Sequence, residues 1–214
     1  MVVVTTTDAE PGLRERKRLA TRRSIQLAVV NLVAEGGLDG VTVDEISRVA
    51  DISPRTFFNY FASKEEAMLG DAPDLPSAAA IGIFLRSTGP ILDDVATLLA
   101  DTGDKSMDDI ELFKLRHGLL KQYPQLLAMR MATMRAFEDS LGEIILQRLA
   151  KDDPALAASP DALASRSRLV TLVAFAAMRH AWICWVNGDP AERLTDRLRE
   201  SFDELSGLFA SVPA

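Results

Sequence analysis

The chain has 214 residues and a mass of 23.3 kDa, which is enough to bury a core and to carry a small module beside a larger one. Its single cysteine, Cys184, cannot form an internal disulfide, so a small disulfide-held secreted scaffold is excluded and a cytoplasmic location is expected. The net charge of −7 argues at first against a nucleic-acid partner, because affinity for phosphates depends on clustered Lys and Arg.

The charge is unevenly distributed along the chain. Residues 1–64 hold nine Lys or Arg and eight Asp or Glu, whereas the remaining residues hold 15 and 23. Between Arg14 and Arg23, six basic side chains accompany one acidic side chain. Such a cluster can supply several phosphate contacts, although the solvated face of an ordinary helix would also carry these residues.

Apolar spacing predicts helices throughout and almost no strands. A first helix is expected over residues 13–35, closed by the glycine pair at 36 and 37. Thr42 with Glu45 forms a capping-box pattern that begins a short helix up to about residue 50. Ser53 followed by Pro54 predicts the start of a second short helix, which ends near Phe61.

The later helices are separated by prolines and glycines. Ser63 with Glu66 predicts a fourth helix from Lys64, but Pro73 and Pro76 leave its continuity through residues 70–77 open. Further helices are expected over residues 78–86, 90–100, 107–122, 124–151, 161–186 and 190–209.

No segment is expected to enter a membrane. The N-terminus turns acidic after three valines and lacks the basic start of a signal peptide. The longest apolar stretch, residues 169–186, approaches the length of a membrane span, but Arg179 and His180 interrupt it. We expect it to form a buried helix of a soluble protein.

Two short helices joined by a tight turn after a longer helix indicate a helix-turn-helix, whose second short helix enters the major groove of DNA. In this pattern one set of side chains packs inward and another faces outward. The inward set is Ile46, Val49, Ala50, Ile52, Phe57 and Phe61, and the outward set is Ser53, Arg55, Thr56, Asn59 and Tyr60.

The run from Leu13 to Leu69 resembles the DNA-binding domain of the Tet-repressor (TetR/AcrR) family of bacterial one-component regulators. The matching positions are Thr21–Arg22, the glycine pair, Thr42–Val43 with Ile46 and Ala50, residues 53–61, and residues 63–65. The resemblance implies an all-α fold in three parts. These are a disordered tail over residues 1–11, a three-helix helix-turn-helix domain over residues 12–70, and a larger helical ligand-binding and dimerisation domain over residues 71–214.

The resemblance also implies roles for individual residues. Positions facing base edges are matched by Pro54, Arg55, Thr56 and Tyr60, with Asn59 as a further polar contact. Arg55 could bond a guanine through O6 and N7. Phosphate contacts are implied for Thr42 and Lys64, and we expect Arg14 and Arg22 to reach the adjacent backbone. Phe58 stands where the family commonly has tyrosine, so that hydroxyl contact is absent.

The acidic remainder shows no catalytic constellation, so we expect no enzyme activity, no cofactor and no metal. His180 and Cys184 lie one helical turn apart, but no third ligand completes a metal set. Hydrogen-bonded histidines in a helical core are the favoured interpretation.

Aromatic and methionine side chains indicate a pocket for a small hydrophobic ligand, although such stripes are more often plain core. The expected lining residues are Phe113, His117, Met134, Phe137, Met178 and Trp182, with Tyr123, Met129, Phe175 and Trp185 nearby. Arg135 and Arg179 would favour an acidic, lipid-like ligand.

The last two helices are expected to form a four-helix bundle with a second copy of the chain. The final helix presents a stripe of Leu194, Leu198, Phe202, Leu205 and Phe209. Packing of this stripe into the chain's own core is the alternative.

The leading hypothesis is a homodimeric repressor that binds a palindromic operator in double-stranded DNA and is released by a small hydrophobic ligand. The alternatives are a transcriptional activator, and a small-molecule-binding protein or enzyme with a degenerate DNA-binding module. Residues 57–61, with Trp182 and Trp185, are similar to an actinobacterial subgroup that includes regulators of mycofactocin genes. That similarity suggests an acyl-CoA or another hydrophobic metabolite as the ligand.

Overall fold

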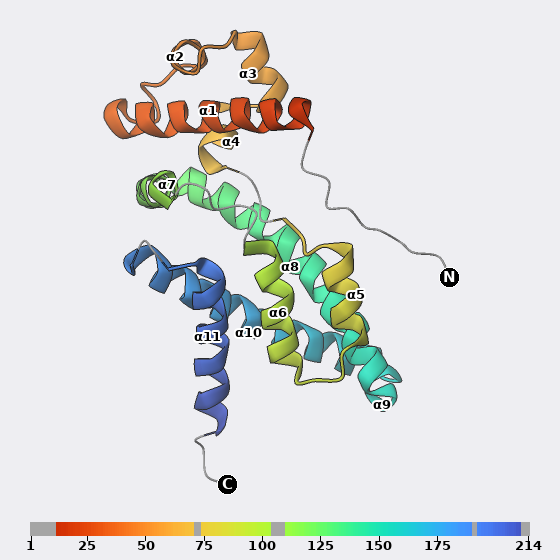
Figure 1. Cartoon of the computed structure of the whole chain (residues 1–214). Helices are drawn as coiled ribbons and strands as arrows, with labels where there is room; N and C mark the ends of the chain where they lie inside the picture. The colour runs from red at the N-terminus through yellow and green to blue at the C-terminus, as the bar shows by residue number, and fades with distance from the viewer. Residues whose placement is uncertain (1–11, 71–73, 104–109, 190–191, 211–214) are drawn as a thin grey trace. The chain divides into compact units, whose positions relative to one another are not determined.

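The computed structural model describes residues 12–70, 74–103, 110–189 and 192–210 (Figure 1). Every regular element in these ranges is a helix, which confirms the all-α prediction. The expected tail, residues 1–11, lies outside the described residues. The described chain forms two compact units. The first holds residues 12–70 and Glu111–Leu127, and the second holds the remaining described residues.

The first unit combines four helices from the N-terminal part with one from the middle of the chain. These are α1 (Leu13–Gly36), α2 (Val43–Val49), α3 (Pro54–Tyr60), α4 (Lys64–Leu69) and nearly all of α7 (Ile110–Gln122) (Figure 1). Their shared core contains Ile25, Val29, Ile46, Phe57 and Met68, together with Leu112, Leu119, Leu120 and Leu126. The segment 111–127 therefore adds buried leucines to the 12–70 range expected from the sequence.

The local capping signals act as predicted. Gly37 follows α1 with a φ of +75°, a conformation that a glycine adopts without strain. The hydroxyl of Ser53 accepts a hydrogen bond from the N–H of Thr56, and Pro54 occupies the first turn of α3. These signals fix where α1 ends and where α3 begins.

The start and end of α4 explain why the chain does not continue as one long helix. The hydroxyl of Ser63 accepts from the N–H of Glu66, as predicted, but the Glu66 carboxylate accepts from the N–H of Ala62 instead of closing the box on Ser63. The helix ends at Leu69, where Gly70 takes a φ of +75°. Residues 74–77 are not helical, so α5 (Ala78–Arg86) is a separate element that Ser77 caps.

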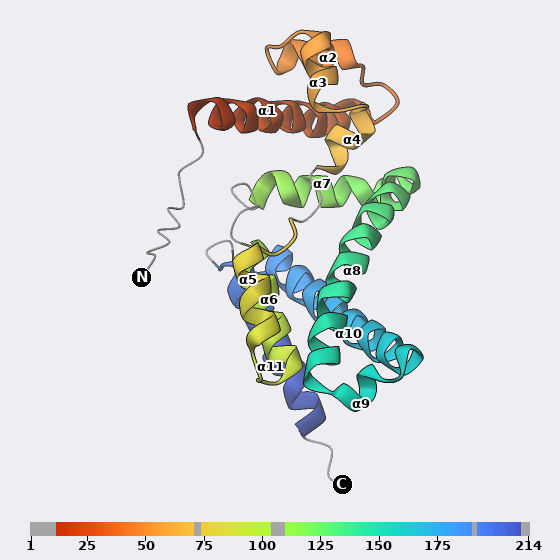
Figure 2. The same ribbon diagram turned by 90° about the vertical axis from the view of Figure 1, so that its right-hand side faces the viewer.

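The second unit contains the remaining helices, which are clearest in Figure 2. They are α5, α6 (Ile91–Gly103), most of α8 (Pro124–Asp152), α9 (Pro154–Ala157), α10 (Pro160–Asn187) and α11 (Leu194–Ala210). The expected boundaries agree to within a few residues. Sequence reasoning missed α9, a single turn capped by Asp153, and began the last helix four residues too early.

Helix α10 buries one stripe and exposes another. Ala174, Ala177 and Ala181 are buried where α10 packs against α11 and α6, as small residues allow. Leu169, Leu172 and Ile183 are about half exposed on another face. By length and composition α10 could cross a membrane, and 33% of its most apolar window is buried inside the unit. The helix that we expected to be buried is therefore buried on one face only.

The expected stripe on α11 packs inside its own unit. Leu198 and Phe202 are buried in the core that α5, α6, α8 and α10 also form, and Leu205 packs against that core. The alternative that we gave for this stripe is therefore the observed one for these three residues. The side chain of Phe209 lies outside the described residues.

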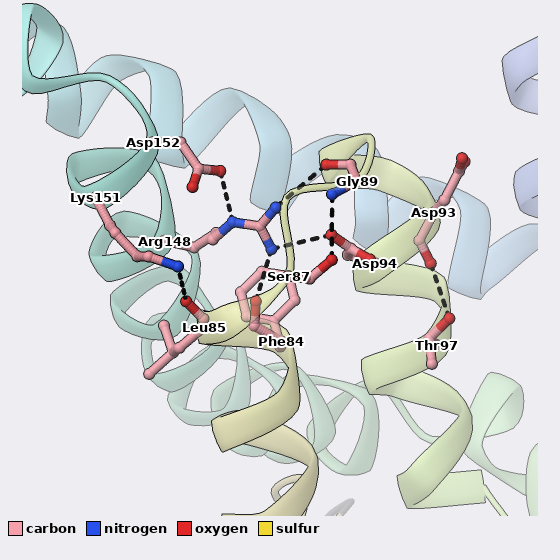
Figure 3. A network of polar contacts seen from close by, with 10 residues as sticks. All are labelled: Phe84, Leu85, Ser87, Gly89, Asp93, Asp94, Thr97, Arg148, Lys151 and Asp152. Atoms are coloured by element: carbon pink, nitrogen blue, oxygen red, sulfur yellow. Dashed lines mark hydrogen bonds and ion pairs between the residues drawn. The ribbon is translucent and has the colours of Figure 1, made fainter.

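A fully buried arginine on α8, Arg148, ties three helices of the second unit together (Figure 3). Its guanidinium donates to the carbonyl oxygen of Phe84 at 2.6 Å, to the carboxylate of Asp94 at 2.9 Å and to the carbonyl oxygen of Gly89 at 3.2 Å. Its Nε donates to Asp152. The charge thus lies among oxygens of α5, the α5–α6 connection, α6 and α8, which offsets its loss of hydration.

Replacing this arginine is expected to destabilise the second unit. In Arg148→Met, two carbonyls and the carboxylate of Asp94 lose their donor, so the free energy of unfolding should fall by about 3 kcal/mol. Chemical denaturation followed by circular dichroism measures the change. Arg166→Met, at an exposed position on α10, should stay within about 0.5 kcal/mol of the parent chain. Equal losses in the two variants would contradict a special role for Arg148.

Candidate nucleic-acid interface

Helix α3 separates an inner from an outer face, as the sequence predicted. Phe57 is fully buried, and Phe61, which directly follows α3, is 1% exposed. The residues expected at base edges lie on the outer side: Pro54, Arg55 and Asn59 are exposed, and Thr56 and Tyr60 are half-buried. Phe58 is also exposed. One inward assignment was wrong, because Val49 at the end of α2 is half exposed.

The basic segment of α1 lies beside this outer face. Arg18 and Arg22 of α1 line an open hollow of about 480 Å³ together with Thr56, Asn59 and Tyr60 of α3. Arg14, Arg16, Lys17 and Arg23 are exposed elsewhere on the same helix. The structure therefore brings two arginines of α1 beside three polar residues of α3 that lie some 40 positions later in the sequence. We call this cationic surface the α1–α3 surface; it consists of Arg18, Arg22, Thr56, Asn59 and Tyr60.

One acidic residue moderates the charge of this surface. Arg18 donates hydrogen bonds to both carboxylate oxygens of Glu15, which lie one turn away. These bonds hold the pKa of the Glu15 carboxyl below its usual value, so it stays ionised at neutral pH. Such an exposed pair is weak and easily rearranged.

Arg22 makes defined contacts inside the first unit. Its guanidinium donates to the carbonyl oxygen of Tyr60 at 2.9 Å and lies over the ring of Phe61, 4.1 Å from the ring centre. Both partners are at the C-terminal end of α3, where the last carbonyls of a helix need donors. Arg22 therefore anchors the end of α3 to α1, a structural role that the sequence did not suggest. Its expected phosphate contact stays a prediction.

Lys64 is held by the connection between α1 and α2. Its ammonium donates to the carbonyl oxygens of Leu38, at 2.6 Å, and Val41, at 2.8 Å. Leu38 and Val41 are both buried in the core of the first unit. An ammonium has three donors, so one stays available for the phosphate contact that we expect.

Thr42 begins α2 through a complete capping box. Its hydroxyl accepts from the N–H of Glu45, and the Glu45 carboxylate accepts from both the N–H and the hydroxyl of Thr42 at 2.9 Å. These bonds lower the pKa of Glu45, the backbone bond most strongly. The cap confirms the predicted helix start, and the exposed Thr42 lies at the surface as a phosphate contact requires.

The residues expected to line a ligand pocket fall in both units. Met134, Phe137 and Met178 pack in the second core, where the ring of Phe137 meets that of Phe175 at 5.8 Å. Trp182 is half-buried on α10. His117 belongs to the first unit, where partial burial, with a smaller effect of Lys121, lowers the pKa of its imidazole. The side chain of Phe113 lies outside the described residues.

His180 contacts Cys184 on its own helix and Ser201 on α11. The Nδ1 of His180 lies 3.0 Å from the hydroxyl of Ser201, and its Nε2 lies 3.5 Å from the sulfur of Cys184. His180 is exposed, so the expectation of a core histidine was wrong in burial although its hydrogen bond is present. Among the described residues, no group of three or more His, Cys, Asp or Glu is arranged to hold a metal.

Comparison with known proteins identifies the first unit. Residues 28–68, which include α2, α3 and most of α4 with its cap, match the model of the family described as "Bacterial regulatory proteins, tetR family". The helix-turn-helix domain of the chain belongs to the tetR family. The N-terminal helix-turn-helix is thus the tetR-type domain that the sequence resembled.

Two relatives match more of the chain than this family model does. The transcriptional regulator TcmR of Streptomyces glaucescens is 28% identical over 145 residues, which is 64% of either chain. A mycofactocin biosynthesis transcriptional regulator of Mycobacterium tuberculosis, MftR, is 29% identical over 62% of this chain and 68% of its own length. The chain thus spans less than two thirds of TcmR.

A solved structure shares the fold. The fatty acid degradation regulator FadR from Bacillus halodurans superposes with a TM-score of 0.54 at 17% identity, covering 93% of this chain and 97% of its own. At this identity the similarity concerns the fold alone, and it extends over both units.

The contacts of Arg22 predict a measurable loss of stability. Arg22→Met keeps most of the aliphatic stem but removes the donor to Tyr60 and the cation over Phe61, so unfolding of the first unit should become easier by about 1 to 3 kcal/mol. Urea denaturation monitored at amides of α3 by NMR would report it. Arg16→Met, at an exposed position on the same helix, is the matched control. An unchanged midpoint for Arg22→Met would show that the anchor contributes nothing.

Proposed function

We propose that this chain is a cytoplasmic, homodimeric transcriptional repressor that binds a palindromic operator and is released by a small hydrophobic ligand. The observation that carries the proposal is the α1–α3 surface, where polar side chains of α3 lie beside the arginines of α1. This is the combination that a DNA-reading helix needs, because cations contact phosphates while polar groups reach base edges. The choice of repressor over activator follows the resemblance to the Tet-repressor family.

In this proposal, side chains on the outer face of α3 contact the DNA bases. Arg55 is exposed in its first turn and can present a bidentate donor pair to guanine. Pro54, Thr56, Asn59 and Tyr60 provide the neighbouring contacts. The phosphates are contacted by Thr42, Lys64 and Arg14, and by Arg22 where its bond to Tyr60 permits.

A second copy of the chain is proposed to cover the exposed stripe of α10. Leu169, Leu172 and Ile183 share one helix face and are about half exposed, a pattern that favours a helix-to-helix interface. The homodimer places two α3 helices on one DNA molecule, and their half-sites must lie about one helical turn apart. Because the dimer is two-fold symmetric, the two half-sites of the operator must form a palindrome.

The ligand is proposed to enter the second unit near Phe137. Met134, Met178 and Phe175 pack around the same core, and thioether and aromatic side chains adapt well to apolar ligands. Arg135 and Arg179 are exposed on α8 and α10, which favours an acidic ligand such as an acyl-CoA or a lipid-like molecule. Release follows if the ligand binds better to a state with wrongly spaced α3 helices.

Selection from a random duplex library would test the operator and the role of Arg55 together. The wild-type chain should enrich a two-fold symmetric sequence. Arg55→Ala should lose about 1 to 3 kcal/mol of discrimination at one position of each half-site, because one bidentate base contact is removed. Arg14→Ala, the matched phosphate-contact variant, should weaken binding to all sequences and reduce the slope of log K against log salt by about one. Failure to enrich any sequence would refute the proposed function.

The dimer interface can be tested by placing charge on the stripe of α10. In Leu172→Asp/Ile183→Asp, each carboxylate is introduced twice across a two-fold interface, so dimer affinity should fall by about 100-fold or more. Sedimentation velocity and operator binding report the change. Leu75→Asp, at an exposed leucine in the non-helical segment 74–77, is the control. An unaltered dimer would show that another surface joins the two copies.

A further inference from the structure

The connection between α1 and α2, residues 37–41, is held from two sides by residues that follow it in the chain. Tyr123 accepts a hydrogen bond from the N–H of Leu38 at 3.1 Å, and Lys64 donates to the carbonyl oxygens of Leu38 and Val41. Both polar backbone groups of Leu38 therefore have side-chain partners. Because Leu38 is only 2% exposed, water cannot easily replace them.

The backbone conformation of Gly37 shapes the place where Tyr123 binds. The hydroxyl oxygen of Tyr123 lies at an ordinary contact distance, 3.5 Å, from the position that a Cβ would occupy on Gly37, so the preference for glycine comes from the φ of +75°. The backbone turns here in a conformation that side chains disfavour, and this turn presents the next N–H, that of Leu38, to the phenol. The glycine pair that ends α1 therefore also shapes the binding place of Tyr123.

Tyr123 also begins helix α8. Its carbonyl oxygen accepts hydrogen bonds from the N–H groups of Leu126, at 3.0 Å, and Leu127, at 3.2 Å. Its ring packs against the core of the first unit, where Leu126 is fully buried. One residue therefore joins the first turn of α8 to the connection 37–41.

The connection determines where α2 lies and, through α2, where α3 lies. Val41 is buried, and the next residue, Thr42, caps α2. The turn between the short helices is fixed by the bond from the N–H of Ile52 to the carbonyl oxygen of Ser47. A shift of the connection would therefore be passed to α3, whose far end Arg22 anchors.

We propose that Tyr123 is a positioning residue for operator reading, which acts by fixing the connection 37–41 and with it α2 and α3. This inference rests on the proposed function, since it concerns how the α1–α3 surface is held. Tyr123 touches no DNA in this proposal. It adjusts the placement of the reading helix through Leu38, which lies 85 positions before Tyr123 in the chain.

The test uses Tyr123→Phe in the full chain, which removes the hydroxyl and keeps the packed ring. Hydrogen exchange of the Leu38 amide should accelerate by about 2- to 10-fold, the size of one hydrogen bond. Affinity for the operator selected by the wild-type chain should fall by a similar factor, while affinity for a random duplex of equal length stays the same. A merely structural role would lower the unfolding temperature without changing the ratio of these two affinities.

The controls separate this inference from the function that it rests on. Gln122→Ala, at the exposed position before Tyr123, should match the wild-type chain in exchange and in binding. Tyr123→Leu should lower the ratio at least as far as Tyr123→Phe. If Tyr123→Phe leaves the ratio of operator affinity to random-duplex affinity unchanged, or leaves the exchange rate of the Leu38 amide unchanged, the inference is overturned. The proposed function would not be affected by either result. If the wild-type chain selects no operator, both fall together.

Discussion

The first unit depends on a constraint at the connection between α1 and α2, where two residues are buried. Leu38 and Val41 lie in the core, so the polar backbone groups beside them must find partners inside the protein. Lys64 in α4 and Tyr123, which lies between α7 and α8, supply these partners. A helix-turn-helix of two seven-residue helices is small for an independent core. The leucines of segment 111–127 enlarge that core, and the hydrogen bond of Tyr123 fixes that segment to the connection.

Helix α8 belongs to both units by its buried residues. Leu126 in its first turn lies in the first core, whereas Phe137, Leu141 and Ile145 lie in the second. The chain between α4 and α5 is not helical over residues 74–77, whereas α8 is helical throughout and, among the described residues, contributes to both cores. We therefore assign the ligand response in the proposed function to α8.

Local signals in the sequence were sufficient for most of the helices and for the caps of α2 and α3. Thr42, Ser53 and Gly37 act through bonds or conformations within four residues, so pattern alone predicts them. The roles of Arg22, Lys64 and Arg148 depend on carbonyl oxygens more than 20 residues away, and no local pattern marks such partners. The same limit explains why Tyr123 was grouped with ligand-lining residues. Its apolar ring suggested a pocket, but its hydroxyl has a partner 85 positions earlier.

The apolar character of α10 has two causes, and the structure separates them. One stripe is apolar because small residues let α11 pack closely, and its alanines are fully or almost fully buried. The other carries Leu169, Leu172 and Ile183 at the surface together with the exposed His180. A bilayer would require an apolar surface all around the helix, and the ionisable Arg179 and His180 at its middle oppose that. A protein partner that covers only the outer face of α10 would bury its exposed leucines and leave the alanine stripe packed against α11. A second copy of the chain can do this, because it presents the same leucines across a two-fold interface.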